Sequence, residues 1–246
     1  MSNATQKVAL VTGASRGIGA EIARRLAADG FAVAINYANS AAAAEKLVAD
    51  LRADGARVTA IQADMAQPEQ VRELFAQCEQ QLGSLDVLVN NAGIMQTMPL
   101  ADTPDELFER TFAVNVQGVF GCLREAAERM NDGGRIINLS TSALALKMPG
   151  YAVYNASKAA VEAMTQVLAK ELRGRQITVN AVAPGPVETE LFLDGKTVEM
   201  VQRLAHMSPL ERLGQPDDIA AVVSFLASTQ GGWVNGQILR ANGGIA

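Results

Sequence analysis

Short apolar runs alternate along the chain with segments of helical periodicity, and no other feature restricts the fold as strongly. The runs predict strands at residues 8–11, 31–35, 58–63, 85–89, 135–139, 177–183 and 236–241. Between them, apolar residues recur every three or four positions, which predicts helices over residues 18–29, 41–53, 68–82, 104–130, 154–173 and 216–228. Strands that are apolar along their whole length are typical of parallel sheets covered on both faces. The sequence therefore predicts an α/β fold: a single doubly wound (Rossmann-like) domain over residues 1–246, with a seven-stranded parallel sheet and helices on both faces.

Composition argues against several classes of function. The net charge is −5 without a basic run, so no nucleic-acid partner is expected, and no apolar run reaches the roughly 18 residues that a membrane helix needs. The first seven residues are polar and lack the apolar core of a signal peptide, which favours a cytoplasmic location. Cys78 and Cys122 form no C-x-x-C pair, and His206 is the only histidine. Neither a metal site nor a Ser-His hydrolase is therefore indicated.

A glycine-rich stretch, Thr12–Gly19, joins the first predicted strand to the first predicted helix. Glycines let the backbone approach a pyrophosphate closely, and the helix N-terminus offers free N–H groups and the positive end of the helix dipole. The spacing G-x3-G-x-G differs from the standard G-x-G-x-x-G fingerprint, and a purely structural turn is the alternative. In this context the stretch predicts dinucleotide binding.

The end of the second predicted strand indicates which dinucleotide is bound. An NAD site has an acidic residue there for the ribose 2′-hydroxyl, whereas residues 36–40 read Asn-Tyr-Ala-Asn-Ser. No carboxylate would repel a 2′-phosphate, and Arg16 in the glycine loop can pair with one. NADP is therefore favoured over NAD, with a solvated loop charge as the alternative interpretation of Arg16.

Tyr154 and Lys158 begin the predicted helix that follows the fifth strand. Four residues apart on a helix, they share one face. An ammonium beside a phenol favours the phenolate, so the pair can act as an acid/base near neutral pH. Such pairs also occur on ordinary helices. Here the pair lies at the carboxyl edge of the predicted sheet, where ligands of doubly wound folds bind.

Four motifs together give the chain a family resemblance over nearly its whole length. They are Thr12-Gly13-x3-Gly17-x-Gly19, Asn90-Asn91-Ala92-Gly93, Tyr154-x3-Lys158 and Pro184-Gly185. In this order they resemble the classical short-chain dehydrogenases/reductases, and the chain is most similar to 3-oxoacyl-carrier-protein reductases and polyhydroxynaphthalene-reductase-like enzymes. The resemblance implies NADPH-dependent reduction of a ketone, a 3-oxoacyl thioester or another small or apolar carbonyl compound, to a secondary alcohol. It also implies a homotetramer.

The resemblance assigns the catalytic residues. Tyr154 is the expected acid/base, Lys158 its pKa-lowering partner, and Asn115 a member of the family's proton relay. The family's serine typically precedes the tyrosine by thirteen residues, a position held here by Thr141. Ser142 is favoured instead if the loop over residues 143–153 is one residue shorter than usual, and Thr141 and Ser140 remain as alternatives.

The expected cofactor-binding residues follow the carboxyl edge. They are Gly13, Ser15, Arg16, Gly17, Ile18, Gly19, Asn36, Asp64, Met65, Asn91, Ala92, Gly93, Tyr154, Lys158, Pro184, Gly185, Val187 and Thr189. The resemblance places Asp64 at the adenine, and Val187 and Thr189 at the nicotinamide carboxamide. Residues 187–213 are the expected substrate loop. With Met95, Gln96, Met98, Met148 and Tyr151, they suggest a largely apolar substrate. The alternatives are an NAD-dependent alcohol or sugar dehydrogenase and a non-catalytic dinucleotide-binding regulator.

Overall fold

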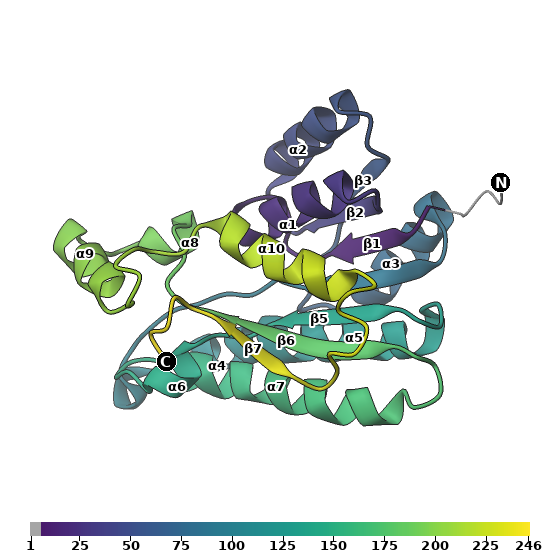
Figure 1. The fold of residues 1–246 in the computed structure, drawn as a ribbon. Helices are drawn as coiled ribbons and strands as arrows, with labels where there is room; N and C mark the ends of the chain where they lie inside the picture. Colours follow the sequence, from purple (N-terminus) through teal and green to yellow (C-terminus); the bar gives the residue numbers. More distant parts are fainter. Residues whose placement is uncertain (1–5) are drawn as a thin grey trace.

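The computed structural model describes residues 6–246, and its strands form one parallel sheet (Figure 1). The described strands are β1 (Val8–Val11), β2 (Ala32–Tyr37), β3 (Val58–Gln62), β4 (Leu85–Asn90), β5 (Arg135–Leu139), β6 (Thr178–Pro184) and β7 (Ile238–Ala241). Their order across the sheet is β3-β2-β1-β4-β5-β6-β7, and every neighbouring pair is parallel. This confirms the doubly wound sheet. The expectation drawn from the polar N-terminal stretch falls mainly on residues 1–5, outside the described residues.

Helices cover both faces of the sheet. They are α1 (Gly17–Ala28), α2 (Ala41–Ala53), α3 (Pro68–Leu82), α4 (Asp105–Phe112), α5 (Gly118–Arg129), α6 (Ala143–Leu146), α7 (Ala152–Glu171), α8 (Glu190–Leu193), α9 (Val198–His206) and α10 (Pro216–Ala227). One hydrophobic core joins α1, α2 and α10 to the sheet, and a second joins α3, α5 and α7 to its other face. No helix within residues 6–246 is long and apolar enough to cross a membrane.

The two cores explain the uninterrupted apolar strands. In β1, Ala9 and Val11 belong to the core beneath α1 and α10, whereas Val8 and Leu10 belong to the core on the opposite face. All four are buried. Since each face of a central strand meets a layer of helices, the residues that point to one face and those that point to the other all need apolar side chains.

The expected continuous helix over residues 104–130 is interrupted. A π-helical turn, η2 (Ala113–Gln117), separates α4 from α5. The buried Asn115 side chain in this turn bonds to the backbone of Ile94, and Gly118 lies against Met65, where a Cβ would come 2.7 Å from the Met65 carbonyl oxygen. These tertiary contacts explain a wide turn that helical periodicity does not reveal. The helix α4 begins after Pro104 without a side-chain cap, and the Thr103 hydroxyl donates to the Pro99 carbonyl oxygen.

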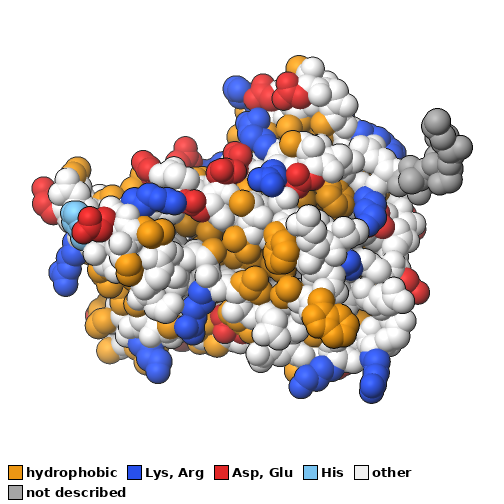
Figure 2. All heavy atoms as spheres, in the orientation of Figure 1, with side chains coloured by type: hydrophobic (Ala, Val, Ile, Leu, Met, Phe, Trp, Pro, Cys, Tyr) orange, Lys and Arg blue, Asp and Glu red, His pale blue; other side chains and the backbone are white. Residues whose placement is uncertain are grey.

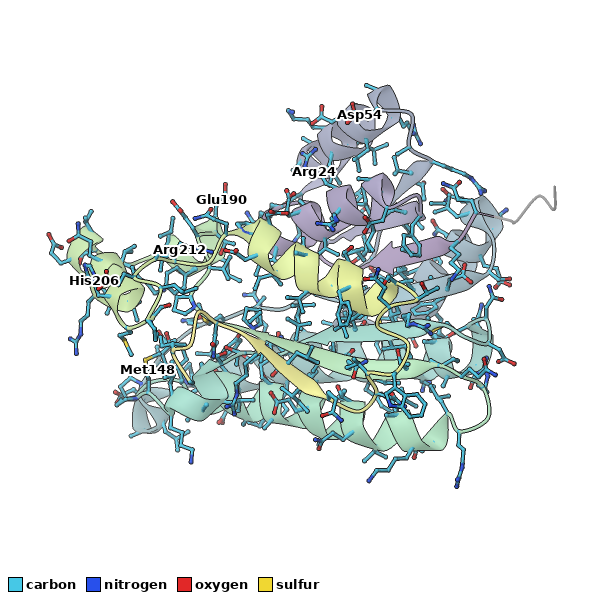
Figure 3. All side chains as sticks on the ribbon, in the orientation of Figure 1. Arg24, Asp54, Met148, Glu190, His206 and Arg212 are labelled. Carbon is cyan, nitrogen blue, oxygen red and sulfur yellow. The ribbon has the colours of Figure 1, made fainter. Side chains whose placement is uncertain are left out.

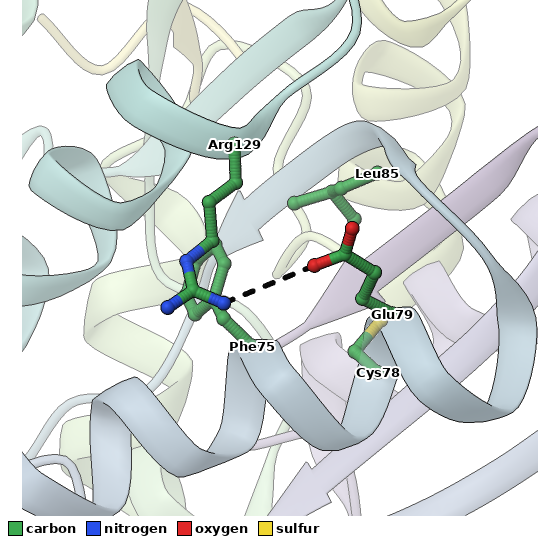
Figure 4. Close-up of a pocket in the computed structure, with 5 residues that line it drawn as sticks. All are labelled: Phe75, Cys78, Glu79, Leu85 and Arg129. Atoms are coloured by element: carbon green, nitrogen blue, oxygen red, sulfur yellow. Dashed lines mark ion pairs between the residues drawn. The ribbon is translucent and has the colours of Figure 1, made fainter.

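A small hollow between α3 and α5 lies at the opposite edge of the sheet from the expected site (Figure 4). Arg129 lies over it, 3.0 Å from Glu125 and 3.8 Å from Glu79. The volume of about 10 Å³ is too small for a substrate. Burial raises the pKa of the Cys78 and Cys122 thiols to about 12, so both are unreactive packing residues.

Candidate active site

The glycine loop is held by close backbone contacts at the carboxyl ends of β1 and β4. Gly13 has φ +61°, and a Cβ there would lie 2.8 Å from the Cα of Ala92. A Cβ on Gly19 would lie 2.5 Å from the Gly13 carbonyl oxygen. The first turn of α1 begins at Gly17 without a side-chain cap. Its N–H groups are therefore available to a phosphate, and at Gly13 and Gly19 a side chain larger than hydrogen does not fit.

Thr12 and Asn91 tie this loop to the end of β4. The Asn91 amide Nδ2 donates to the carbonyl oxygens of Thr12 and Gly13, both at 2.9 Å. In return, the Thr12 hydroxyl accepts the backbone N–H groups of Asn91 and Ala92, both at 3.0 Å. Asn91 thus positions the phosphate loop and has no free amide proton for a ligand.

Two expected cofactor residues direct their side chains into the protein instead. Asn36 is 1% exposed; its Nδ2 donates to Ala63 O at 3.0 Å and its Oδ1 accepts the Gly13 N–H at 3.1 Å. Met65 is buried in the core beside Cys122. The expectation of cofactor contacts through these two side chains is therefore corrected. Asn36 positions the glycine loop, and Met65 packs under α5.

The other residues at the adenine end remain accessible. Asp64 is half-buried, and its Oδ1 accepts the Ala66 N–H at 2.9 Å. The Arg16 side chain is 68% exposed, and its Nη1 lies 3.4 Å from Glu190 Oε2 in α8. An ion pair this exposed contributes little stability, so Arg16 is free to bind an anion. Ser15 is half-buried, and Ile18 packs on the core beneath α1.

Tyr154 and Lys158 lie on α7 with the phenol ring and the ammonium group close together. The Lys158 Nζ is 6.0 Å from the Tyr154 ring centroid and donates to the Leu139 carbonyl oxygen at 2.8 Å. Gly93 packs against this group: a Cβ there would lie 3.4 Å from Lys158 Nζ and 3.3 Å from Asn115 Oδ1. The end of β4, the π-helical turn and α7 therefore converge on one place.

Asn115 acts as a clamp within this group. Its Oδ1 accepts the Ile94 N–H at 2.8 Å, and its Nδ2 donates to Ile94 O at 2.9 Å and to Ser157 Oγ at 3.1 Å. The side chain is fully buried. It holds the loop after β4 against α7, and its expected part in a proton relay stays a prediction.

Burial dominates the acid–base properties of the pair. It raises the pKa of Tyr154 to about 12, while a hydrogen bond from Thr141 opposes the rise. Burial also lowers the pKa of Lys158 to about 8. In the protein without cofactor, loss of hydration dominates both groups, and the expected role of Lys158 as the pKa-lowering partner of Tyr154 stays a prediction. A positive charge added beside the phenol would be needed to reverse the shift.

Of the three residues that follow β5, Thr141 is the one whose hydrogen bonding lowers the pKa of Tyr154, and its Oγ1 also accepts the Ala143 N–H at 3.2 Å. Ser142, the favoured residue, is 1% exposed, donates its proton to Ala183 O at 2.9 Å and accepts from Asn242 Nδ2 at 3.0 Å. Ser140 donates to Glu162 Oε1 at 2.6 Å. The expectation for Ser142 is corrected, because its hydroxyl points to β6 and the C-terminal segment rather than to Tyr154.

The segment after β6 closes the other side of the edge. Gly185 lies against Asn242, and the Thr189 methyl would lie 3.6 Å from a Cβ on Gly17. Pro184 ends β6, and Val187 is buried in a bridge to Gly214. Thr189 caps α8 by accepting the Phe192 N–H at 3.2 Å. The expected nicotinamide-side residues thus border the glycine loop.

The expected substrate wall is far less buried. Neither α8 nor α9 contributes a buried residue, and Figure 3 shows Glu190 on α8 and His206 on α9 at the outside of this region. On the facing side, Met98 N–H donates to Gly150 O at 2.9 Å, which joins the loop after β4 to the loop before α7. Tyr151 meets Tyr154 edge to face at 6.4 Å. In these two loops, Met95, Met98 and Met148 are half-buried, whereas Gln96 is exposed.

Two supporting residues on α7 were not predicted from the sequence. Ser157 bonds to Asn115, and Glu162 accepts from Ser140. Glu162 lies four residues after Lys158 and eight after Tyr154, on the same helical face. That spacing was the available signal, whereas the contact of Ser157 required the π-helical turn to be known.

The chain is similar to known proteins over almost its whole length. The family model described as "Enoyl-(Acyl carrier protein) reductase" matches residues 13–246. A short-chain type dehydrogenase/reductase of Picea abies is 49% identical, covering 97% of this chain and 92% of the relative. An NADPH-dependent aldehyde reductase-like protein, chloroplastic, of Arabidopsis thaliana is 45% identical, covering 97% and 93%.

Solved structures agree. A short-chain dehydrogenase/reductase from Serratia marcescens has a TM-score of 0.93 at 41% identity, covering 98% of each chain. A short-chain dehydrogenase from Burkholderia cenocepacia in complex with NADP has a TM-score of 0.92 at 41% identity, covering 99% of each chain. Fold and site already define a dinucleotide-binding oxidoreductase architecture. The chain belongs to the short-chain dehydrogenase/reductase family.

Proposed function

We propose that the protein is an NADP(H)-dependent reductase of ketones or other carbonyl compounds. The observation that carries the proposal is the placement of Tyr154 and the buried Lys158 beside Gly93, the residue that follows Ala92, on which Gly13 of the glycine loop packs. A phenol, an ammonium and a hydroxyl at a dinucleotide site are suited to hydride transfer coupled to proton transfer. Relatives named as NADPH-dependent aldehyde reductase and versicolorin reductase support this function.

The described residues fit NADP. The cradle around Gly13 and Gly19 leaves no room for side chains but leaves the first N–H groups of α1 to the pyrophosphate. Arg16, exposed at the end of this cradle, binds the 2′-phosphate, and no carboxylate occupies residues 36–40 to oppose it. Asp64 contacts the adenine, while Val187 and Thr189 border the nicotinamide carboxamide.

NADPH, held by the glycine loop and Arg16, would supply the hydride that reduces the carbonyl carbon. Tyr154 donates its phenolic proton to the carbonyl oxygen of the substrate. Thr141 forms hydrogen bonds with the phenolic oxygen and the carbonyl oxygen as negative charge develops on them. Lys158, whose pKa burial lowers to about 8, keeps a positive charge near the phenol at neutral pH and stabilises the phenolate that remains. Asn115 holds the loop after β4 in place, which keeps Gly93 packed against Lys158.

A screen of ketones and aldehydes with NADPH tests this function. We expect NADPH oxidation with at least one apolar ketone, and a much smaller rate with NADH at equal concentration. Because the facing loops contribute three half-buried methionines and Tyr151, flat or branched apolar carbonyl compounds are the expected substrates. Absence of oxidation across the panel, with NADPH bound, would support a non-catalytic role instead.

We also propose that the protein is a homotetramer. Hydrophobic side chains gather over α10 and β7 (Figure 2), where Phe225 is exposed and Trp233 is 98% exposed. A separate exposed set lies on α4, α5 and α7, formed by Phe108, Phe120 and Val167. Two distinct apolar faces are what a tetramer with perpendicular twofold axes requires. Light scattering should give the mass of four 25.9 kDa chains.

A cytoplasmic location is part of the same proposal. Cys78 and Cys122 are both free thiols, as is usual in a reducing compartment. NADPH is also plentiful where reductive chemistry proceeds. Fractionation of the source cells would test the location directly.

A further inference from the structure

Thr141 is held from both sides by serines that do not reach the phenol. On one side, Ser140 Oγ donates to Glu162 Oε1 on α7 at 2.6 Å. On the other, the backbone N–H of Ser142 donates to Pro184 O at 2.8 Å, and its hydroxyl donates to Ala183 O at 2.9 Å. Thr141 therefore lies in the chain between one anchor on the helix of Tyr154 and another on β6, and its Oγ1 accepts the Ala143 N–H of the same turn at 3.2 Å.

The second anchor continues into the C-terminal segment. Asn242 Nδ2 donates to the Ser142 hydroxyl oxygen at 3.0 Å and to the Ala246 carbonyl oxygen at 3.0 Å, while its Oδ1 accepts the Gly244 N–H at 2.9 Å. A Cβ on Gly185 would lie 2.9 Å from the Asn242 Cα. The Asn242 backbone is thus packed closely against the chain that follows β6, and its amide has little freedom to turn.

The direction of these bonds determines which residue fits at position 242. A serine hydroxyl has one proton, and that of Ser142 is given to Ala183 O, so its oxygen acts as an acceptor toward position 242. An amide supplies the needed N–H donor at this point. A carboxylate of the same shape would place an acceptor against an acceptor in a site where Ser142 is 1% exposed.

We propose that Ser142 and Asn242 are positioning residues that hold the Thr141 hydroxyl against the Tyr154 phenol. The inference rests on the proposed reductase function and on Thr141 as its hydroxyl residue. The two residues touch neither cofactor nor substrate in this scheme. They fix the turn after β5, and through it they link the C-terminal segment to the acid–base pair.

Steady-state kinetics of Ser142→Ala and Asn242→Asp test the proposal. We expect kcat to fall about 10- to 100-fold in both variants, since a small displacement of a catalytic group has this effect. The KM for NADPH should stay within about twofold, because the glycine loop is untouched. The double variant should be no slower than the worse single variant, since both act through one hydrogen bond.

A pH profile separates positioning from general structural damage. The Thr141 hydrogen bond lowers the pKa of Tyr154. Losing it should shift the pH of half-maximal alcohol oxidation with NADP⁺ upward in both variants. In a Thr141→Ala background, Ser142→Ala should have no further effect on kcat or on the profile. Asn235→Asp serves as the matched control, because it makes the same substitution just before β7, whereas Asn242 lies just after it.

Several results would overturn the proposal. Unchanged kcat and pH profile in both variants would show that Thr141 needs no such support. A KM for NADPH that rises in step with the loss of kcat would place the pair in cofactor binding. If Ser142→Ala fails to fold, Asn242→Asp, a smaller change, carries the same comparison.

Crystal structures make the test independent of activity. In Ser142→Ala, the Thr141 hydroxyl should turn away from the Tyr154 phenol, and an unmoved Thr141 would contradict the inference even if no substrate were known. Conversely, inactivity of the wild-type protein on the ketone panel would refute the proposed function and leave this structural result standing.

Discussion

The two walls of the site are built in opposite ways. The cofactor wall is closed by its own contacts: Gly13 lies against Ala92, and both amide protons of Asn91 are used within the protein. The substrate wall, α8 and α9, has no buried residue and exposes Leu191, Val198 and Met200. Dinucleotide binding is therefore preorganised, whereas substrate recognition is left to a segment with few contacts of its own.

The difference has a physical origin. The cofactor is one compound, so a rigid cradle can match its bound conformation without losing affinity to ordering of the protein. A segment that must cover different or bulky carbonyl compounds keeps its apolar side chains exposed until something packs on them. The residues proposed for catalysis, Thr141, Tyr154 and Lys158, lie on the rigid side, in the turn after β5 and on α7. The following predictions test whether this division is real.

Apart from removal of the Tyr154 hydroxyl, the largest effect is expected for Lys158→Met. Turnover should fall about 10³-fold, because the positive partner of the phenolate is lost. Stability should change in the opposite direction. Burial lowers the pKa of Lys158 from 10.5 to about 8, so the unfolded chain binds an extra proton between these values and stability rises with pH there. At pH 7 the buried ammonium costs about 3 kcal/mol.

Urea denaturation of the cofactor-free protein at several pH values checks this. Lys158→Met should unfold at higher urea than wild type at pH 7, with most of the difference gone at pH 10.5. A variant that is less stable at pH 7, with an unchanged pH dependence, would mean that the bond to Leu139 outweighs the desolvation.

A pair of glycine substitutions compares the walls directly. Gly13 has φ +61° and Gly195, between α8 and α9, has φ +69°, so alanine is strained at both by about 1–2 kcal/mol. Only at Gly13 does a Cβ meet backbone; around Gly195 nothing lies within 4 Å. We expect Gly13→Ala to weaken NADPH binding at least about 100-fold, and Gly195→Ala to leave it unchanged. Fluorescence titration measures both, and equal losses would refute the difference between the walls.

Arg16→Ala is expected to act on cofactor choice alone. The KM for NADPH should rise about 10- to 50-fold, the worth of one charge-assisted contact, while the KM for NADH stays within about twofold. Glu190→Ala, which removes the partner of Arg16, should leave the KM for NADPH unchanged or slightly lower. Equal effects of Arg16→Ala on both cofactors would exclude the 2′-phosphate contact.

The smallest effect is expected on the substrate wall. Met200→Ser on α9 should raise the KM for an apolar ketone about two- to fivefold, since one exposed side chain loses part of its apolar contact. NADPH affinity and the midpoint of thermal unfolding should not change. A loss of stability of more than about 1 kcal/mol would show that α9 is packed in solution as firmly as the cofactor wall.

The sheet and most helix boundaries could be predicted from the sequence because periodicity reports burial. The helices over residues 41–53 and 68–82 and the strand over 135–139 have the expected limits. Features decided by tertiary contact could not be predicted. The π-helical turn at Asn115 and the short helix α6 depend on partners distant in sequence, Ile94 and Asn155 respectively.

The location of the site could be predicted from the sequence more fully than the contacts of its side chains. Motif order brought the glycine loop, Gly93, Tyr154 and Lys158 to one edge, where the structure has them. Spacing alone could not decide between Thr141 and Ser142, because the direction of each hydroxyl depends on Ala183 and Asn242. Nor could it show that the Asn36 and Met65 side chains turn inward.

The central claim is that the cofactor wall binds NADPH whether or not the acid–base chemistry works. Tyr154→Phe, assayed for NADPH affinity and for ketone reduction in the same preparation, tests it most directly. We predict an unchanged dissociation constant and a fall in kcat of about 10³-fold or more, since only the phenolic hydroxyl is removed. Retained turnover would contradict the role of Tyr154, and lost NADPH binding would contradict the independence of the cofactor wall.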